Sequence, residues 1–178
     1  MESSSALFII DESTATLNFE ASIRHRCPSW HRSCDPKELM SDPDLTVSAV
    51  LADDLRAWLT SELRYPVLAI NTADGPPNQS VMWFDLHSDR PDTIVMNTMV
   101  RRLKYRQLQE DPRVSILFED GLKWVGVRGT VEMDADFDRA LQSIQDLARR
   151  YGGNPERYAG QERVILNIRV EKVIRHDQ

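Results

Sequence analysis

The sequence predicts an α+β protein whose antiparallel sheet is built from hairpins, with about six strands and three helices. Short apolar runs that alternate with period two recur between Gly, Pro and Asp turns, and three other stretches repeat their apolar residues at helical spacing. At 178 residues, 41% of them hydrophobic, the chain can bury one sizeable core and is short for two. This order of elements is consistent with a small closed β-barrel and flanking helices.

Residues 1–44 show neither period, and mix Ser/Thr-rich stretches with a segment of Cys, His and Pro. We expect them to be an appended or poorly ordered extension, and residues 45–178 to be the folded domain. Cys27 and Cys34 lie in the extension near two histidines, at spacings that zinc sites do not usually have. We therefore predict no metal, and the role of the extension and of its cysteines stays open.

The predicted elements begin with a helix, because apolar residues from Val47 to Leu63 recur at helical spacing. Residues 65–71 then predict a strand. The Asp74-Gly75 pair predicts a hairpin turn, with residues 78–86 as the partner strand. A second turn leads into a short strand at residues 93–97.

A short helix is expected next, with Thr98 as its cap and Asp111-Pro112 as its end. Strands at residues 114–118 and 123–133 follow, and two glycines in the second of them indicate a bend or bulge.

The last two elements are a helix and a strand. An amphipathic helix from Phe137 to Tyr151 is closed by Gly152-Gly153. The strand at residues 164–170 alternates cleanly, with its aliphatic residues on one face.

The start of the short central helix is the most informative segment. Four basic residues fall within positions 101–106 of a chain whose net charge is −6. Near the positive end of the helix dipole, Arg101, Arg102 and Lys104 would each be unfavourable by about 0.3–1 kcal/mol. A bound phosphate would reverse that sign, since backbone N–H groups and an Arg/Lys pair bind it. We therefore predict an anion site, with a solvated helix face as the alternative.

Charge and motifs exclude several functional classes. The negative net charge argues against general nucleic-acid binding, and no apolar run approaches the roughly 18–20 residues that cross a bilayer. The N-terminus lacks the features of a signal peptide, so we expect a soluble, cytoplasmic protein. No nucleophile elbow or dinucleotide-binding motif occurs. We predict no catalytic side chain and expect a bound cofactor to carry the chemistry.

Three stretches carry a family resemblance. Residues 75–84 read Gly-x-Pro-x-x-Ser-x-x-Trp-Phe, and residues 97–115 hold the basic cluster and the strand after it. The third stretch is residues 127–131, taken together with the distant residues 149–153 and 158–160. Together they resemble the pyridoxamine 5'-phosphate oxidase-like split β-barrel family, in particular its branch of F420 (deazaflavin)-dependent oxidoreductases. The resemblance implies an FMN-binding type of split barrel with about six antiparallel strands.

The resemblance also implies a function and a site. It implies hydride transfer between reduced F420 and a small organic substrate, in a homodimer with the cofactor at the subunit interface. Arg102 and Lys104 would bind the cofactor phosphate, and the ring would lie against a set of residues from two strands, which are Asn78, Ser80, Val81, Met82, Asn97 and Thr98.

Other cofactors and roles stay open at this point. An Arg/Lys phosphate site fits FMN or a pyridoxal-type phosphate as well as F420. A non-catalytic protein that binds a flavin or haem is a further alternative. The substrate and the direction of the reaction are not predicted.

Overall fold

The computed structural model describes residues 45–176. They form one eight-stranded sheet with the order β3-β2-β6-β7-β8-β5-β4, and β1 pairs separately with β8. Every pair of neighbouring strands is antiparallel. The strands are β1 (Leu45–Ser48), β2 (Val67–Ile70), β3 (Asn78–Val81), β4 (Asp85–Leu86), β5 (Thr93–Met99), β6 (Arg113–Asp120), β7 (Lys123–Asp134) and β8 (Arg163–His176). The predicted α+β class is confirmed. The extension predicted for residues 1–44, with Cys27 and Cys34, lies outside the described residues, and the domain boundary stays a prediction.

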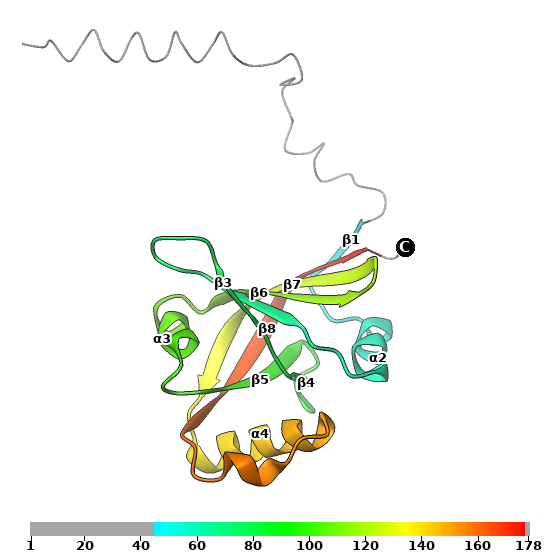
Figure 1. Ribbon diagram of the computed structural model, residues 1–178. Coiled ribbons are helices and arrows are strands. Elements are labelled where there is room, and N and C mark those ends of the chain that lie inside the picture. Colours follow the sequence, from blue (N-terminus) through cyan, green and yellow to red (C-terminus); the bar gives the residue numbers. More distant parts are fainter. Residues whose placement is uncertain (1–44, 177–178) are drawn as a thin grey trace, which may run out of the picture. The chain divides into compact units, whose positions relative to one another are not determined.

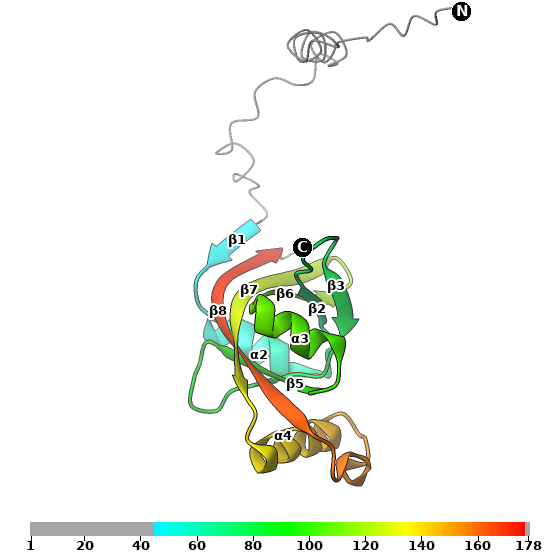
Figure 2. The same ribbon diagram turned by 90° about the vertical axis from the view of Figure 1, so that its left-hand side faces the viewer.

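The helices close the curled sheet. They are α2 (Asp53–Ser61), α3 (Leu103–Glu110) and α4 (Phe137–Arg150), with a short 3-10 turn, η2 (Pro155–Tyr158), after α4. Figures 1 and 2 show α3 and α2 at opposite ends of the curl and α4 outside it, where α4 packs on β8 and β5. Leu55 and Leu59 of α2 and Leu108 of α3 are almost fully buried. The helices α2 and α3 therefore each close one end of the barrel with apolar side chains.

The core lies inside the curl, where alternate residues of each strand meet. Side chains at the inward positions of the strands are fully buried, as period-two patterning predicts. Examples with 0% exposure are Leu68, Ile116, Phe118 and Val127. Their neighbours in sequence point outward. The predicted strands β6 and β7 and the predicted alternation of β8 are confirmed, although β8 continues to His176, beyond the predicted end at residue 170.

One predicted strand is wrong. Residues 78–86 are not a single strand but two, because the chain leaves β2 after Val81 and joins β5 at Asp85. The intervening residues cross from one edge of the sheet to the other, held by a 2.9 Å hydrogen bond from the Met82 N–H to the carbonyl oxygen of Pro66. Among the described residues β3 and β4 do not pair with each other. The barrel is therefore split, and a covalent segment spans the split.

The first predicted helix also needs correction. Residues 45–48 pair with the end of β8 as β1, and the helix begins only at Asp53. Val47 and Val50 are about half exposed and take no part in the helix. An extended segment can match helical spacing by chance when it is only four residues long, which explains the error.

A bulge bends β7, as its two glycines predict. The pairing of β7 with β8 shifts register between Arg128 and Gly129. A Cβ atom on Gly129 would lie 2.3 Å from the carbonyl oxygen of Arg169, whereas one on Gly126 would make ordinary contacts at 3.5 Å or more. Gly129 is therefore needed because β8 approaches its backbone closely.

Tyr151, at the end of α4, fastens this helix to the segment that spans the split. Its hydroxyl donates to the carbonyl oxygen of Arg64 at 2.7 Å and accepts from the N–H of Phe84 at 3.3 Å. The Trp83 ring stacks on the Tyr151 ring, with 5.1 Å between centroids and 10° between planes. The Gly152 that follows has a φ of 71°, which ends the helix as predicted.

Candidate functional site

The candidate site lies at the end of the barrel that α3 plugs. The turn from β5 into α3 carries Arg101 and Arg102, and Arg102 is the N-cap residue, without a side-chain capping hydrogen bond. The prediction of Thr98 as the cap is wrong, because Thr98 is still within β5, paired with Val164, and is buried. The strand runs two residues further than its apolar pattern indicates, so the helix starts later.

Lys104 is the side chain that joins α3 to β3. Its ammonium group donates to the Ser80 hydroxyl at 2.7 Å and lies 3.0 Å from the sulfur of Met82. The side chain is half-buried. Three of the predicted site residues, which are far apart in sequence, are therefore in direct contact.

No carboxylate in the part of the chain that the structure describes compensates the charge of Lys104. Within residues 45–176 no Asp or Glu oxygen lies within 4 Å of the ammonium group. Burial lowers the pKa of Lys104 below its ordinary value, and the neighbouring charge of Arg102 lowers it further. An anion bound here would offset both effects.

Arg163, at the start of β8, is a further cation of this site that sequence reasoning missed. It is only 9% exposed, and its Nε donates to the Asn97 amide oxygen at 2.6 Å while its Nη1 donates to the Gln161 amide oxygen at 2.6 Å. Burial lowers the pKa of Arg163; Tyr158 opposes this shift, and Arg102 adds to it. Arg102 thus acts electrostatically on both Lys104 and Arg163. In sequence, Arg163 is only the first residue of an apolar strand, which gives no signal.

Asn97 and Thr98, near the end of β5, lie below the surface of the candidate site. Both are buried, and the Asn97 amide nitrogen donates to the carbonyl oxygen of Ala140 at 2.9 Å while its oxygen accepts from Arg163. Asn97 therefore ties β5 to the first turn of α4 and orients Arg163. Any contact of these two residues with a ligand stays a prediction.

The remaining predicted residues of β3 face different sides. Asn78 and Ser80 lie on one face of the strand, and Val81, 64% exposed, lies on the other. Asn78 lines a pocket of about 580 Å3 between the β2–β3 hairpin and α3, together with Leu103 and Arg106. One ligand on the Ser80 face would not touch the Val81 side chain of the same subunit.

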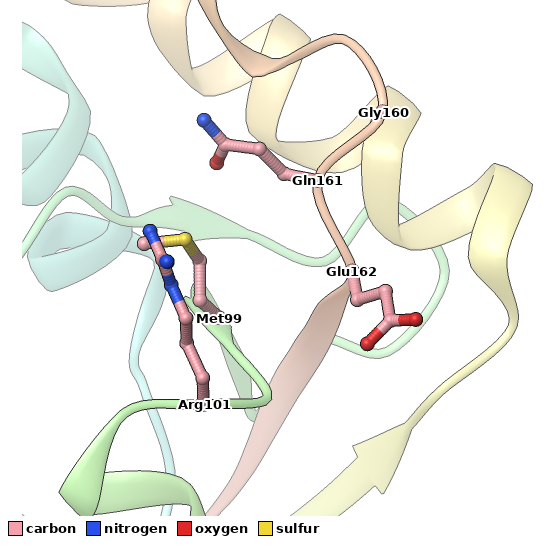
Figure 3. A pocket seen from close by; sticks show the side chains of 5 residues that line it. All are labelled: Met99, Arg101, Gly160, Gln161 and Glu162. Carbon is pink, nitrogen blue, oxygen red and sulfur yellow. The ribbon is translucent and has the colours of Figure 1, made fainter.

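A second pocket, of about 260 Å3, adjoins the start of α3. Met99, Arg101, Gly160, Gln161 and Glu162 line it (Figure 3). It lies between the β5–α3 turn and the loop before β8. A 3.2 Å hydrogen bond from the Val100 N–H to the carbonyl oxygen of Glu162 joins these two segments.

Two kinds of feature are absent from the part of the chain that the structure describes. No helix within residues 45–176 is long and apolar enough to span a membrane. In the same part of the chain, no group of three His, Cys, Asp or Glu side chains is placed to hold a metal ion. The candidate site offers cations and hydroxyl or amide groups, which can bind and orient an anion.

A comparison of the sequence with models of known protein families finds a match over most of the described chain. The sequence model of the family described as pyridoxamine 5'-phosphate oxidase matches residues 51–177. No curated protein matches the chain in sequence.

Similar folds occur among solved structures. An F420 reductase is 26% identical, with a TM-score of 0.56, over 66% of this chain and 94% of that one. A conserved hypothetical protein from Mycobacterium tuberculosis is 23% identical, with a TM-score of 0.58, over 71% and 85%. HupZ from Group A Streptococcus is 18% identical, with a TM-score of 0.51, over 68% and 90%. The last two likenesses concern the fold alone.

Proposed function

This chain belongs to the pyridoxamine 5'-phosphate oxidase family, and from that premise we propose that it binds F420 and transfers hydride between this cofactor and a small organic substrate. The family typically binds FMN or F420, and FMN is the alternative cofactor. The preference for F420 is supported by the F420 reductase, because the likeness covers 94% of that protein.

The observation that carries the proposal is the half-buried ammonium group of Lys104, which has no carboxylate partner within the described residues. Holding a cation partly out of water beside Arg102 is unfavourable, and a bound anion would offset this cost. A phosphate group fits this donor set, since Lys104 offers a point charge and Arg102 a planar fork of N–H donors.

In this proposal the residues of the chain bind the cofactor and orient it. Lys104 and Arg102 would hold the phosphate, while Ser80 keeps the Lys104 ammonium directed at the site through its 2.7 Å hydrogen bond. Bound F420 or FMN supplies the hydride chemistry. Asn78, Ser80 and Met82 of β3 and the segment after it, with Asn97 and Thr98 beneath, would set the position of the ring system.

We also propose a homodimer with the cofactor at the subunit interface. The outer face of the sheet supports it, because Val81 is 64% and Leu117 43% exposed there, and because Val67 and Trp124 flank a hollow of about 390 Å3 on the same face. Exposed apolar side chains gathered on one sheet face mark an interaction surface. A second subunit on this face would bring a partner copy's β3 near Val81, whose side chain points away from its own subunit's phosphate site.

The test is a titration of the purified full-length protein with F420, FMN, pyridoxal 5'-phosphate and haem, one at a time. Visible absorbance reports each complex, and a thermal shift reports binding to the folded state, which raises stability by mass action. We expect saturable binding of F420, and weaker binding of FMN. The double variant Arg102→Ala, Lys104→Ala should lose most of the thermal shift, whereas Arg149→Ala on the exposed side of α4 should keep it.

Three outcomes would contradict parts of the proposal. Saturation by FMN alone would replace the cofactor, and saturation by haem without any flavin would make the protein a non-catalytic binder of the alternative kind. Full affinity in the double variant would place the phosphate elsewhere.

A further inference from the structure

The lysines within residues 45–176, which are Lys104, Lys123 and Lys172, differ in what surrounds the amine. The amine of Lys123 lies over the Trp58 ring, 5.0 Å from its centroid, where its positive charge makes a cation–π contact. The amine of Lys104 instead contacts two uncharged acceptors. These are the Ser80 hydroxyl oxygen at 2.7 Å and the Met82 sulfur at 3.0 Å.

The geometry around Lys104 suits its neutral form. A neutral amine has two N–H groups and one lone pair, whereas an ammonium group has three N–H groups and no lone pair. When its two N–H groups are donated to Ser80 and Met82, the neutral amine directs its lone pair away from both. Burial, and then the charge of Arg102, lower the pKa of Lys104, which increases the neutral fraction at a given pH. Lys104 is therefore placed to act as a nucleophile.

This amine lies beside a cation that can hold one end of a reactive ligand. Arg102 is exposed, stands two residues before Lys104 at the start of α3, and is near enough for its charge to act on the amine. A guanidinium group binds a phosphate through paired, charge-assisted hydrogen bonds. Lysines whose pKa is lowered by burial or by a neighbouring cation form Schiff bases with carbonyl compounds. A ligand with a phosphate and an aldehyde would therefore meet both groups at once.

We propose that Lys104 is a covalent modification site for aldehydes that carry a phosphate group. The inference rests on the anion site of the proposed function, and it does not require that F420 be the cofactor. In the reaction, the lone pair of the Lys104 nitrogen forms a bond to the aldehyde carbon. The carbonyl oxygen then leaves as water with the two protons of the amine, and a C=N bond remains. No group is oxidised or reduced.

The modification regulates the site. An imine on Lys104 uses the amine and the Arg102 guanidinium group that would otherwise hold the phosphate of F420 or FMN. The aldehyde and the cofactor therefore exclude each other. Because water hydrolyses an imine back to the free amine, the block is reversible.

The experiment uses pyridoxal 5'-phosphate as the probe, with pyridoxal, which lacks the phosphate, as its matched control. Each is titrated into the full-length protein, and the visible absorbance of the imine is recorded. The imine is then trapped with borohydride and mapped by peptide mass spectrometry. We expect the trapped adduct on Lys104, suppressed by saturating F420 or FMN. Pyridoxal should bind about tenfold or more weakly, because it forms no charge-assisted hydrogen bonds with Arg102.

Two variants separate the covalent step from the effect of charge. Lys104→Arg keeps a cation on α3 but forms no imine, so the visible band should disappear while the melting curve shows a folded protein. Lys172→Met is the matched control. It removes a lysine from β8, which β2, β6 and β7 separate from β3 in the sheet, and it should leave the band and the adduct unchanged.

Several results would overturn the modification site. They are equal trapping on Lys37, Lys104, Lys123 and Lys172, equal affinity for the two probes, a visible band that persists in Lys104→Arg, and an adduct that saturating cofactor does not reduce. Each leaves the proposed function in place, because that function is tested by F420 binding that depends on Arg102 and Lys104. Trapping on Lys104 in a protein that binds no F420 would instead support the modification and overturn the proposed function.

Discussion

Replacing Lys104 by methionine should separate cofactor binding from stability. The substitution keeps the apolar part of the side chain at a similar length and places a second thioether beside that of Met82. It removes the ammonium group that donates to the Ser80 hydroxyl. A hydrogen bond to a charged group contributes about 1.5–3 kcal/mol, so cofactor affinity should fall by roughly 10- to 150-fold. The cofactor-free protein should not lose stability, because the substitution removes a half-buried cation together with its repulsion from the charge of Arg102.

The stability of the cofactor-free native protein should rise with pH relative to that of Lys104→Met, which a general folding defect would not produce. Folding lowers the pKa of Lys104 below its ordinary value of 10.5, so the unfolded chain holds this proton more tightly. The unfavourable contribution of Lys104 is therefore complete below the folded pKa and is relieved as pH rises toward 10.5. The melting temperature of the native protein should approach that of Lys104→Met over this range.

The assay is a titration of both proteins with F420 and FMN, together with cofactor-free melting curves from neutral pH to about pH 10. Arg149→Met is the control, since it removes a positive charge from the exposed side of α4, away from the candidate site. Two results would refute the reasoning: a Lys104→Met protein that binds both cofactors as tightly as the native one, or one whose cofactor-free form melts well below it.

Further predictions concern the barrel and its interface. Gly129→Ala should destabilise the protein by about 3 kcal/mol in denaturant unfolding, because the new methyl group would meet a β8 carbonyl oxygen at 2.3 Å, whereas Gly126→Ala should cost under 1 kcal/mol; equal effects would contradict the bulge geometry. Tyr151→Phe should lower the unfolding free energy by about 1–3 kcal/mol, since a buried carbonyl oxygen and a buried N–H lose their partner; an unchanged value would contradict that role. The pKa of Asp111 is depressed by hydrogen bonds from a neighbouring arginine, so its contribution is present above pH 3.8 and is lost as pH falls below it; melting curves of Asp111→Asn between pH 6 and 2 should therefore converge on the native curve in acid, and parallel curves would contradict this. Leu117→Asp should convert a dimer into a monomer in sedimentation, and an unchanged mass would move the interface elsewhere.

The fold could be predicted from sequence where a local period carries it. The strands β6 and β7 and the helix α4 are each long and regular enough for their apolar spacing to be read without knowledge of their neighbours. The break at residues 82–84 could not be read in this way, because Met82, Trp83 and Phe84 continue an apolar run while the chain changes its pairing partner. The four-residue β1 is too short to show a period at all.

The candidate site was predicted in part for a similar reason. The basic cluster is local in sequence, so an anion site at the start of α3 could be inferred from charge alone. The contact of Lys104 with Ser80 joins residues 24 positions apart, and the hydrogen bond of Arg163 with Asn97 joins residues 66 positions apart. Such pairs follow from how β3, β5 and β8 curl around α3, and no spacing in the sequence encodes them.

A crystal structure of the full-length protein grown with F420 tests the central claim most directly. The account predicts phosphate oxygens within about 2.7–3.2 Å of the Lys104 ammonium group and of the Arg102 guanidinium group, with Ser80 still in contact with Lys104. A cofactor whose phosphate binds to other residues, while Lys104 keeps only Ser80 and Met82 as neighbours, would contradict it.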